Sequence, residues 1–219
     1  MERWATFDCY GTLIDWNGGI GRSLERLFGA DAAASLQHAY HQVEPEVQRE
    51  QPARSYRDVL AVTLARLAER SGLRLDAGSE DALARSLPFW DPFPEVRESL
   101  EDVRARGWKI AILSNTDRDF IDASLARIAV PFDLVVVASE IGAYKPDHRH
   151  RQVFAEQTGA DPARHVHVGA SLFHDVAPAL ELGLPTVWIN RLGEEPEPQP
   201  TAELHTLSGL GAVLGGLVG

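Results

Sequence analysis

The chain has little cysteine and little positive charge, and it has no long apolar run. Cys9 is the only cysteine among 219 residues, so no internal disulfide can form, which fits a reducing compartment. No segment approaches the roughly 18 apolar residues of a membrane span, and the N-terminus lacks the apolar run of a signal peptide. We therefore expect a cytoplasmic protein.

The deficit of basic residues argues against several classes of partner. Lys and Arg number 21 against 32 Asp and Glu, which gives a formal net charge of −11. An acidic surface is repelled by nucleic acid and by anionic membranes, so neither is expected as a partner. A small-molecule ligand remains the expected partner class.

Short apolar segments alternate with helical patterns at the N-terminus and again after residue 94. Strands are expected at 4–7, 109–113, 134–137, 165–168 and 186–189. Helices are expected at 95–106, 119–128, 147–158, 174–182 and 204–217. Such alternation is typical of an α/β fold with a doubly wound, Rossmann-like parallel sheet covered by helices on both faces.

Residues from about 18 to 87 show helical patterns only. Helices are expected at 21–28, 32–50, 54–70 and 80–87, and Pro45 should kink or divide the second of them. The sequence thus predicts a core domain of residues 1–15 and 92–219, and an inserted helical cap of residues 16–91. A cap over the carboxyl ends of the strands would exclude water from a site there.

Polar residues follow the expected strands. Asp8 ends the first strand, and Gly11 lets the chain turn sharply beside its carboxylate. Ligands of open α/β sheets bind at this carboxyl edge. An ordinary helix N-cap is the competing interpretation for Asp8.

Similar residues follow three later strands: Ser114 and Asn115, then Lys145, then Asp175. Taken alone, the first pair is better explained by plain helix capping. Lys145, just before a helix that Pro146 would begin, opposes the helix dipole, so a negative group is expected nearby.

The order and strand-end placement of Asp8, Ser114–Asn115, Lys145 and Asp175 resemble the haloacid dehalogenase-like hydrolases. The resemblance covers nearly the whole chain, including the cap. It implies that Asp8 is a nucleophile and that Lys145 keeps it ionised. It also implies that Asp175 positions Lys145 or activates water.

Two positions separate the chain from the magnesium-dependent phosphatases of that superfamily. Tyr10 stands where the phosphatases carry a second Asp, and Ala170 replaces the Asp of a Gly-Asp pair. Mg²⁺ prefers carboxylate oxygens, and tyrosine exchanges protons poorly at neutral pH. These losses favour a reaction without a metal or other cofactor.

The segments 8–12 and 144–147 resemble the L-2-haloacid dehalogenase branch. This resemblance implies displacement of halide from short 2-haloalkanoic acids through an aspartyl ester, with a small organic anion as substrate. The substrate-binding residues it implies are Tyr10, Thr12, Ser114, Asn115 and Ser171.

Several positions depart from that branch. Ala170 and Leu172 stand where Ser and Asn are usual, with Ser171 as a substitute for one of them. Arg151 stands where an aromatic hydroxyl is expected. The cap lacks an Arg at the expected place, where the sequence has His38, Tyr40 and His41; Arg49, Arg54 and Trp16 are alternative candidates for binding the departing halide.

Two other functions therefore stay open. One is a phosphatase whose Mg²⁺ is held by Asp8, the Tyr10 carbonyl and Asp175. The other is a catalytically silent relative that binds a small anion or a protein. The pairs His148/His150 and His165/His167 lack carboxylate or Cys partners at ligand spacing, so they argue only weakly for a metal. The resemblance also leaves room for a homodimer.

Overall fold

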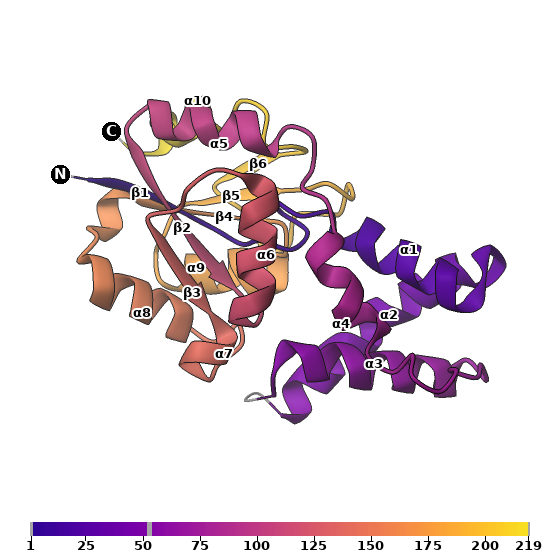
Figure 1. The fold of residues 1–219 in the computed structure, drawn as a ribbon. Coiled ribbons are helices and arrows are strands. Elements are labelled where there is room, and N and C mark those ends of the chain that lie inside the picture. The colour runs from indigo at the N-terminus through magenta and orange to yellow at the C-terminus, as the bar shows by residue number, and fades with distance from the viewer. Residues whose placement is uncertain (1, 52–53, 219) are drawn as a thin grey trace.

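The computed structural model describes residues 2–51 and 54–218, and its centre is a six-stranded parallel sheet (Figure 1). The strands are β1 (Arg3–Phe7), β2 (Trp108–Ser114), β3 (Leu134–Val137), β4 (His165–Gly169), β5 (Thr186–Ile189) and β6 (Ala202–Leu204). Their order is β3-β2-β1-β4-β5-β6, so the N-terminal strand lies in the middle of the sheet. The strand order reverses between β1 and β4, the point at which open α/β sheets bind ligands.

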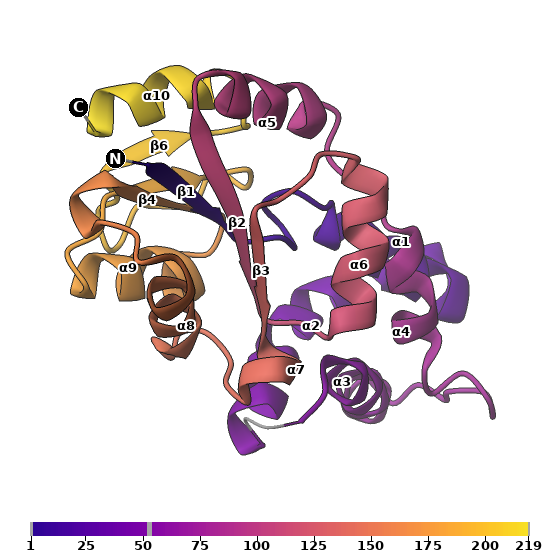
Figure 2. The ribbon, with the colours of Figure 1, turned by 60° about the vertical axis from the view of Figure 1, so that its left-hand side comes forward.

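Helices cover both faces of the sheet (Figure 2). One side carries α5 (Val96–Ala105), α6 (Arg118–Ile128) and α10 (Leu210–Leu217), and the other carries α8 (Arg149–Thr158) and α9 (Ala177–Glu181). Alternate residues of β2 enter two separate cores: Ile110 and Ile112 the larger, Ala111 and Leu113 the smaller. The predicted doubly wound fold is confirmed.

Short turns complete the sheet part of the molecule. They are α7 (Ala138–Ile141), η2 (Pro162–Arg164) and the π-helical turn η3 (Leu172–Val176).

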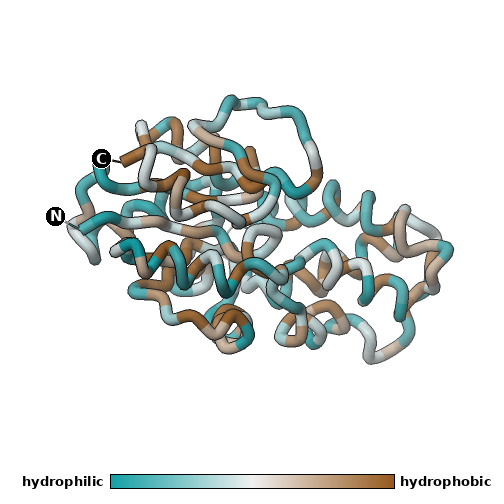
Figure 3. Tube along the Cα trace, turned by 90° about the horizontal axis from the view of Figure 1, so that it is seen from above, coloured by the Kyte–Doolittle hydropathy of each residue, from teal (hydrophilic) through white to brown (hydrophobic). Residues whose placement is uncertain are grey.

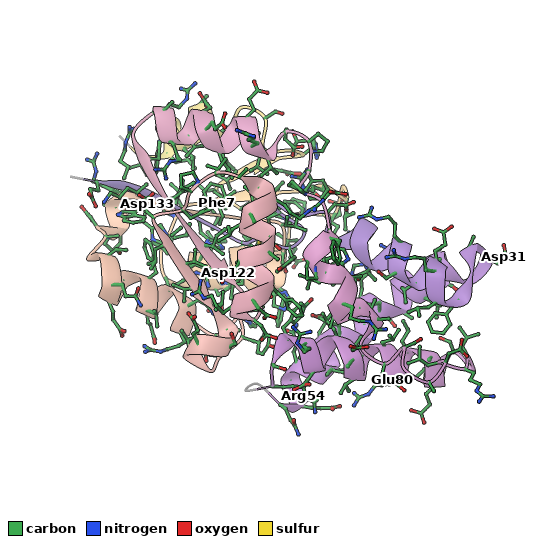
Figure 4. The ribbon with its side chains drawn as sticks, in the orientation of Figure 1. Phe7, Asp31, Arg54, Glu80, Asp122 and Asp133 are labelled. Atoms are coloured by element: carbon green, nitrogen blue, oxygen red, sulfur yellow. The ribbon has the colours of Figure 1, made fainter. Side chains whose placement is uncertain are left out.

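The chain between β1 and β2 first forms a helical part that lies beside the sheet. Its elements are α1 (Trp16–Phe28), α2 (Ala30–Glu50), α3 (Tyr56–Arg70), α4 (Ala82–Ser86) and the 3₁₀ turn η1 (Leu87–Phe89). Figure 3 shows apolar and polar segments alternating along these helices, and Figure 4 shows Asp31 at the end of this part that lies away from the sheet. This is the cap that the sequence predicts, and the residue boundaries of the two domains stay a prediction.

The structure corrects four expectations about helices. Pro45 does not divide α2, which runs unbroken from Ala30 to Glu50. The reason is tertiary packing: α2 lies against both α1 and α3. These contacts bury side chains on both sides of the proline, among them Val43 and Val47.

The expected C-terminal helix of residues 204–217 is wrong in its first part. Leu204 ends the edge strand β6 and pairs with Ile189, while α10 begins only at Leu210.

The expected helix of residues 147–158 begins at Arg149, four residues after Lys145 rather than directly beside it. The helix dipole argument for Lys145 is therefore weaker than the sequence implies. The expected helix of residues 174–182 is divided between η3 and α9.

In the part of the chain that the structure describes, every helix is too short or too polar to cross a membrane.

Candidate active site

Asp8 lies at the carboxyl end of β1, at the point where the strand order reverses. Its backbone N–H donates to the Val168 carbonyl at 2.9 Å, which extends the pairing of β1 with β4 by one residue. Gly11 then turns the chain with a φ of 91°, a value that L side chains rarely adopt. Thr12 returns to the carboxylate, and its hydroxyl donates to Asp8 Oδ2 at 2.9 Å.

Lys145 joins Asp8 to a second carboxylate. Its Nζ lies 2.7 Å from Asp8 Oδ1 and 2.7 Å from Asp175 Oδ1, and all three side chains are buried. Asn115 holds the lysine backbone, accepting from Lys145 N at 2.6 Å and donating to Lys145 O at 3.0 Å. A buried ion pair of this kind depends on good geometry, which the Asn115 clamp supplies.

Asp175 is surrounded by donors. His167 Nε2 lies 3.3 Å from Oδ1, and Ser171 N donates to Oδ2 at 3.2 Å. The Arg151 guanidinium donates to the backbone carbonyl of Asp175 at 2.9 Å. Both carboxylate oxygens are therefore occupied within the protein.

The histidines of β4 form an ordered hydrogen-bond chain behind Asp175. Thr6 Oγ1 lies 2.8 Å from His165 Nε2 and 2.9 Å from His167 Nδ1. Burial lowers the pKa of His167 to about 4, so the ring is neutral and has one N–H. A carboxylate accepts only, so that N–H is on Nε2. Thr6 must then donate to His167 Nδ1 and accept from His165.

The two carboxyls around Lys145 differ in acidity. Burial raises the pKa of Asp8 to about 6, against the pull of the Lys145 ammonium. Burial acts the same way on Asp175, but Lys145 and the hydrogen bond from His167 outweigh it and hold the pKa of Asp175 below its usual range. Asp8 is thus the carboxyl that takes up a proton first. Burial opposes the charge of Lys145, but Asp175 and Asp8 raise the pKa of Lys145 above that of an ordinary lysine.

A cavity of about 420 Å³ opens beside this triad and is bounded by both parts of the molecule. From the sheet it is lined by Asp8, Tyr10, Ser114, Asn115, Lys145, Ala170, Ser171, His174, Asp175 and Arg191. From the helices it is lined by Trp16, Asn17, His41, Glu44, Pro45, Gln48 and Tyr56. A cavity of this size lies within the range of small-molecule sites.

The structure brings the eight site residues predicted from the sequence to this region, in different ways. Ser114 Oγ is buried at the cavity and has no hydrogen-bond partner among the described residues. Ser171 Oγ is engaged by His174, whose Nδ1 lies 3.0 Å away. Tyr10 turns its hydroxyl to Ser124 at 3.0 Å, so that its ring rather than a free hydroxyl contributes to the cavity. Thr12 lies behind Asp8 and does not line the cavity.

Of the cap residues considered from the sequence, Trp16 and His41 reach the cavity, whereas Arg49 and Arg54 are not among its lining residues. The sequence analysis missed Arg191. Its guanidinium stacks on Phe93 at 3.5 Å and donates to Glu95 at 2.7 Å and to the Thr12 carbonyl at 2.8 Å. Arg191 follows β5 at the same edge as the other site residues, which is the signal that could have revealed it.

The residues at this edge do not fit Mg²⁺ well. The Lys145 ammonium already lies between Asp8 and Asp175, and Tyr10 and Ala170 supply no further carboxylate. Within residues 2–51 and 54–218, no group of three or more His, Cys, Asp or Glu side chains is placed to hold a metal ion. Of the two histidine pairs considered for a metal, His165 and His167 both contact Thr6 Oγ1. In the other pair, His148 Nε2 lies 3.2 Å from Glu181 Oε2 and His150 Nε2 lies 3.0 Å from the Ser114 carbonyl.

The chain is similar in sequence and in fold to known proteins. A family model described as haloacid dehalogenase-like hydrolase matches residues 3–183. The (S)-2-haloacid dehalogenase of Pseudomonas sp. (strain YL) is 32% identical over 208 residues, which cover 92% of this chain and 89% of that protein. Phosphatase MT3486 of Mycobacterium tuberculosis (strain CDC 1551 / Oshkosh) is 32% identical over 153 residues, 66% of each chain. The crystal structure of a dehalogenase with intermediate complex is similar at a TM-score of 0.86 and 25% identity, covering 97% of this chain and 96% of that chain.

Proposed function

Because the chain belongs to the haloacid dehalogenase-like hydrolases, we propose that it releases halide from short 2-haloalkanoic acids through an ester on Asp8. One observation carries the proposal: Lys145 Nζ lies 2.7 Å from Asp8 Oδ1 at the wall of a cavity of about 420 Å³. A carboxylate held ionised by one ammonium and open to a cavity is suited to nucleophilic attack.

In the first step, a carboxylate oxygen of Asp8 attacks the substrate carbon that bears the halogen. The new C–O bond forms as the carbon–halogen bond breaks, and the halide leaves with the electron pair. Attack from the side opposite the halogen inverts the configuration of that carbon. Thr12, which donates to Asp8 Oδ2, and Lys145 hold the carboxylate in place for this step.

In the second step, water adds to the side-chain carbonyl of the Asp8 ester. The acyl–oxygen bond breaks, a 2-hydroxy acid leaves, and Asp8 becomes a carboxylate again with the release of one proton. We assign Asp175 to positioning Lys145 rather than to activating this water. Its low pKa makes it a weak base, and its oxygens accept from Lys145, His167 and Ser171.

The substrate is then a small organic anion that contacts the free hydroxyl of Ser114, with Tyr10 and Ser171 beside it in the cavity. Both polar atoms of the Asn115 amide, Nδ2 and Oδ1, form hydrogen bonds with the Lys145 backbone. Asn115 therefore positions the lysine. The proposal needs no metal or other cofactor. We also propose that the protein is cytoplasmic. Homodimerisation stays a prediction, which sedimentation measurements would test.

The test is chloride release from (S)-2-chloropropionate in the presence and absence of a chelator. We expect release that a chelator leaves unchanged and that Asp8→Asn and Lys145→Ala abolish. Asp122→Asn, on the exposed side of α6 (Figure 4), and Lys109→Ala, the other lysine of the chain, are the matched controls and should keep full activity. Turnover in H₂¹⁸O should place the label in the peptide that contains Asp8.

The similarity to a phosphatase gives a second candidate a specific basis, a Mg²⁺-dependent phosphomonoesterase. Phosphate release that a chelator abolishes, with no halide release from any haloacid, would select it. Binding of 2-haloacids without turnover would instead select a catalytically silent relative.

A further inference from the structure

Glu44 is a buried carboxyl group in the cap wall of the cavity. It lies on α2, is only 7% exposed, and lines the same space as Asp8. Gln48, one helical turn further on, donates to Glu44 Oε1 at 2.5 Å. Glu44 and the triad around Lys145 therefore face one cavity from different parts of the molecule.

Glu44 forms no salt bridge with any Lys, Arg or His in the part of the chain that the structure describes. The two cations that line the cavity are already engaged: Lys145 with Asp8 and Asp175, and Arg191 with Glu95. Buried ionised groups in proteins are normally paired. Among the described residues, Glu44 is thus the one buried carboxyl of the cavity that has no cation partner.

The rest of the lining strengthens this imbalance. Five carboxyl-bearing residues line the cavity, namely Asp8, Asp15, Glu44, Asp175 and Glu194, against the two cations Lys145 and Arg191. A substrate that carried only its own carboxylate would add negative charge to a wall that already has an excess of it. A substrate with a positive group at its far end would relieve that excess.

We propose that Glu44 selects 2-haloacids whose carbon chain ends in an ammonium group, which pairs with the Glu44 carboxylate while Asp8 attacks the halogen-bearing carbon. This inference rests on the proposed function, since it names the substrate class of the same site. The cavity has room for such a chain, because about 420 Å³ is the liquid volume of about fourteen waters. Gln48 holds Glu44 in place from the side, and Tyr56 and His41 complete the cap wall.

Burial disfavours the ionised form of Glu44 until a cation lies beside it. Burial raises the pKa of Glu44 to about 7, against hydrogen bonds from Gln48 and Tyr56. A ligand ammonium would favour the ionised form, so the proton leaves Glu44 when the substrate binds.

The experiment compares three chlorinated acids that differ only at the far end of the chain. These are 4-amino-2-chlorobutyrate, its methyl counterpart 2-chloropentanoate, and the dicarboxylate 2-chloroglutarate. We expect kcat/KM for the ammonium compound to exceed that for the methyl compound by about tenfold or more, with the dicarboxylate poorest, since a charge-assisted hydrogen bond has that strength. Glu44→Gln should remove most of this preference, chiefly through KM. Glu46→Gln, which removes a half-buried carboxyl of the same helix that pairs with Arg70 and does not line the cavity, should preserve it.

A binding measurement separates failure of this inference from failure of the proposed function. The Asp8→Asn variant is titrated by calorimetry with 4-amino-2-hydroxybutyrate and with 2-hydroxypentanoate. Tighter binding of the amino acid, lost in the double variant with Glu44→Gln, supports the assignment even if no haloacid is turned over. Equal binding of the two, or equal turnover of the ammonium and methyl substrates, overturns the assignment and leaves dehalogenation itself untouched.

Discussion

His167 Nε2 lies 3.3 Å from Oδ1 of Asp175, and His167, unlike Asp175, is not among the residues that line the cavity. The same oxygen accepts from Lys145 Nζ at 2.7 Å. The imidazole and the ammonium thus share one acceptor, and the neutral ring donates the weaker of the two bonds. This arrangement favours the ionised form of Asp175, so that a proton arriving at the site goes to Asp8.

Replacing His167 should therefore change the acidity of the site as well as its rate. We expect His167→Leu to lower kcat about tenfold and to move the acid limb of the pH–rate profile upward, because Asp175 can then share the proton. His167→Gln, whose amide nitrogen takes the place of Nε2, should restore both. A rate loss that is the same in both variants, with no change in the profile, would reduce His167 to a packing residue.

The pH dependence of the unmodified enzyme should follow Asp8. The attacking group is the carboxylate, and its pKa is raised to about 6, mainly by burial. The rate should therefore rise as the pH increases through about 6 and stay level until Lys145 loses its proton, above the ordinary lysine range. Halide release measured from pH 4 to pH 11 checks this. An acid limb near pH 4 would mean that Lys145 and Thr12 outweigh burial.

Gly169 should tolerate no side chain. A Cβ built at this position would lie 2.5 Å from Cγ of Asp175, closer than real Cβ atoms approach. We expect Gly169→Ala to displace Asp175, lower kcat at least tenfold and cost about 1–3 kcal/mol of unfolding free energy. Gly215→Ala in α10 is the matched control, because a Cβ there meets nothing within 4 Å, and it should be neutral or slightly stabilising. Thermal unfolding and steady-state kinetics measure both effects.

Asp117 should hold the cap against the sheet. Its two carboxylate oxygens accept from the backbone N–H groups of Tyr56 and Arg57, both at 2.9 Å, at the start of α3. Asp117→Ala should cost about 0.5–2 kcal/mol, as loss of a helix cap does, and should raise KM more than it lowers kcat because Tyr56 lines the cavity. Asp119→Asn, which breaks only the exposed pair with Arg57, should change stability by less than about 1 kcal/mol. Equal effects of the two variants would show that Asp117 does not attach the cap to the sheet.

The sequence was most informative where one local rule applied to several segments. The carboxyl ends of parallel strands meet at one edge, so the sequence alone predicts that Asp8, Ser114, Lys145 and Asp175 lie together. Periodicity was less informative near Lys145 and at the C-terminus, where the expected helices begin at Arg149 and Leu210 instead. Pro45 shows why: tertiary packing keeps α2 whole against the preference of a single residue.

The sequence by itself determined the alternation of strands and helices, the helical insertion and the strand-end residues, because these depend on short-range patterns and on the rules of parallel sheets. Only the tertiary structure decided which atoms meet. It placed Glu44 of the cap at the cavity, joined His167 to Asp175 through a defined tautomer, set Arg191 on Phe93, and attached α3 to Asp117. These contacts join segments from 8 to 98 positions apart along the chain, and they depend on how helices pack against a sheet, which no local pattern specifies.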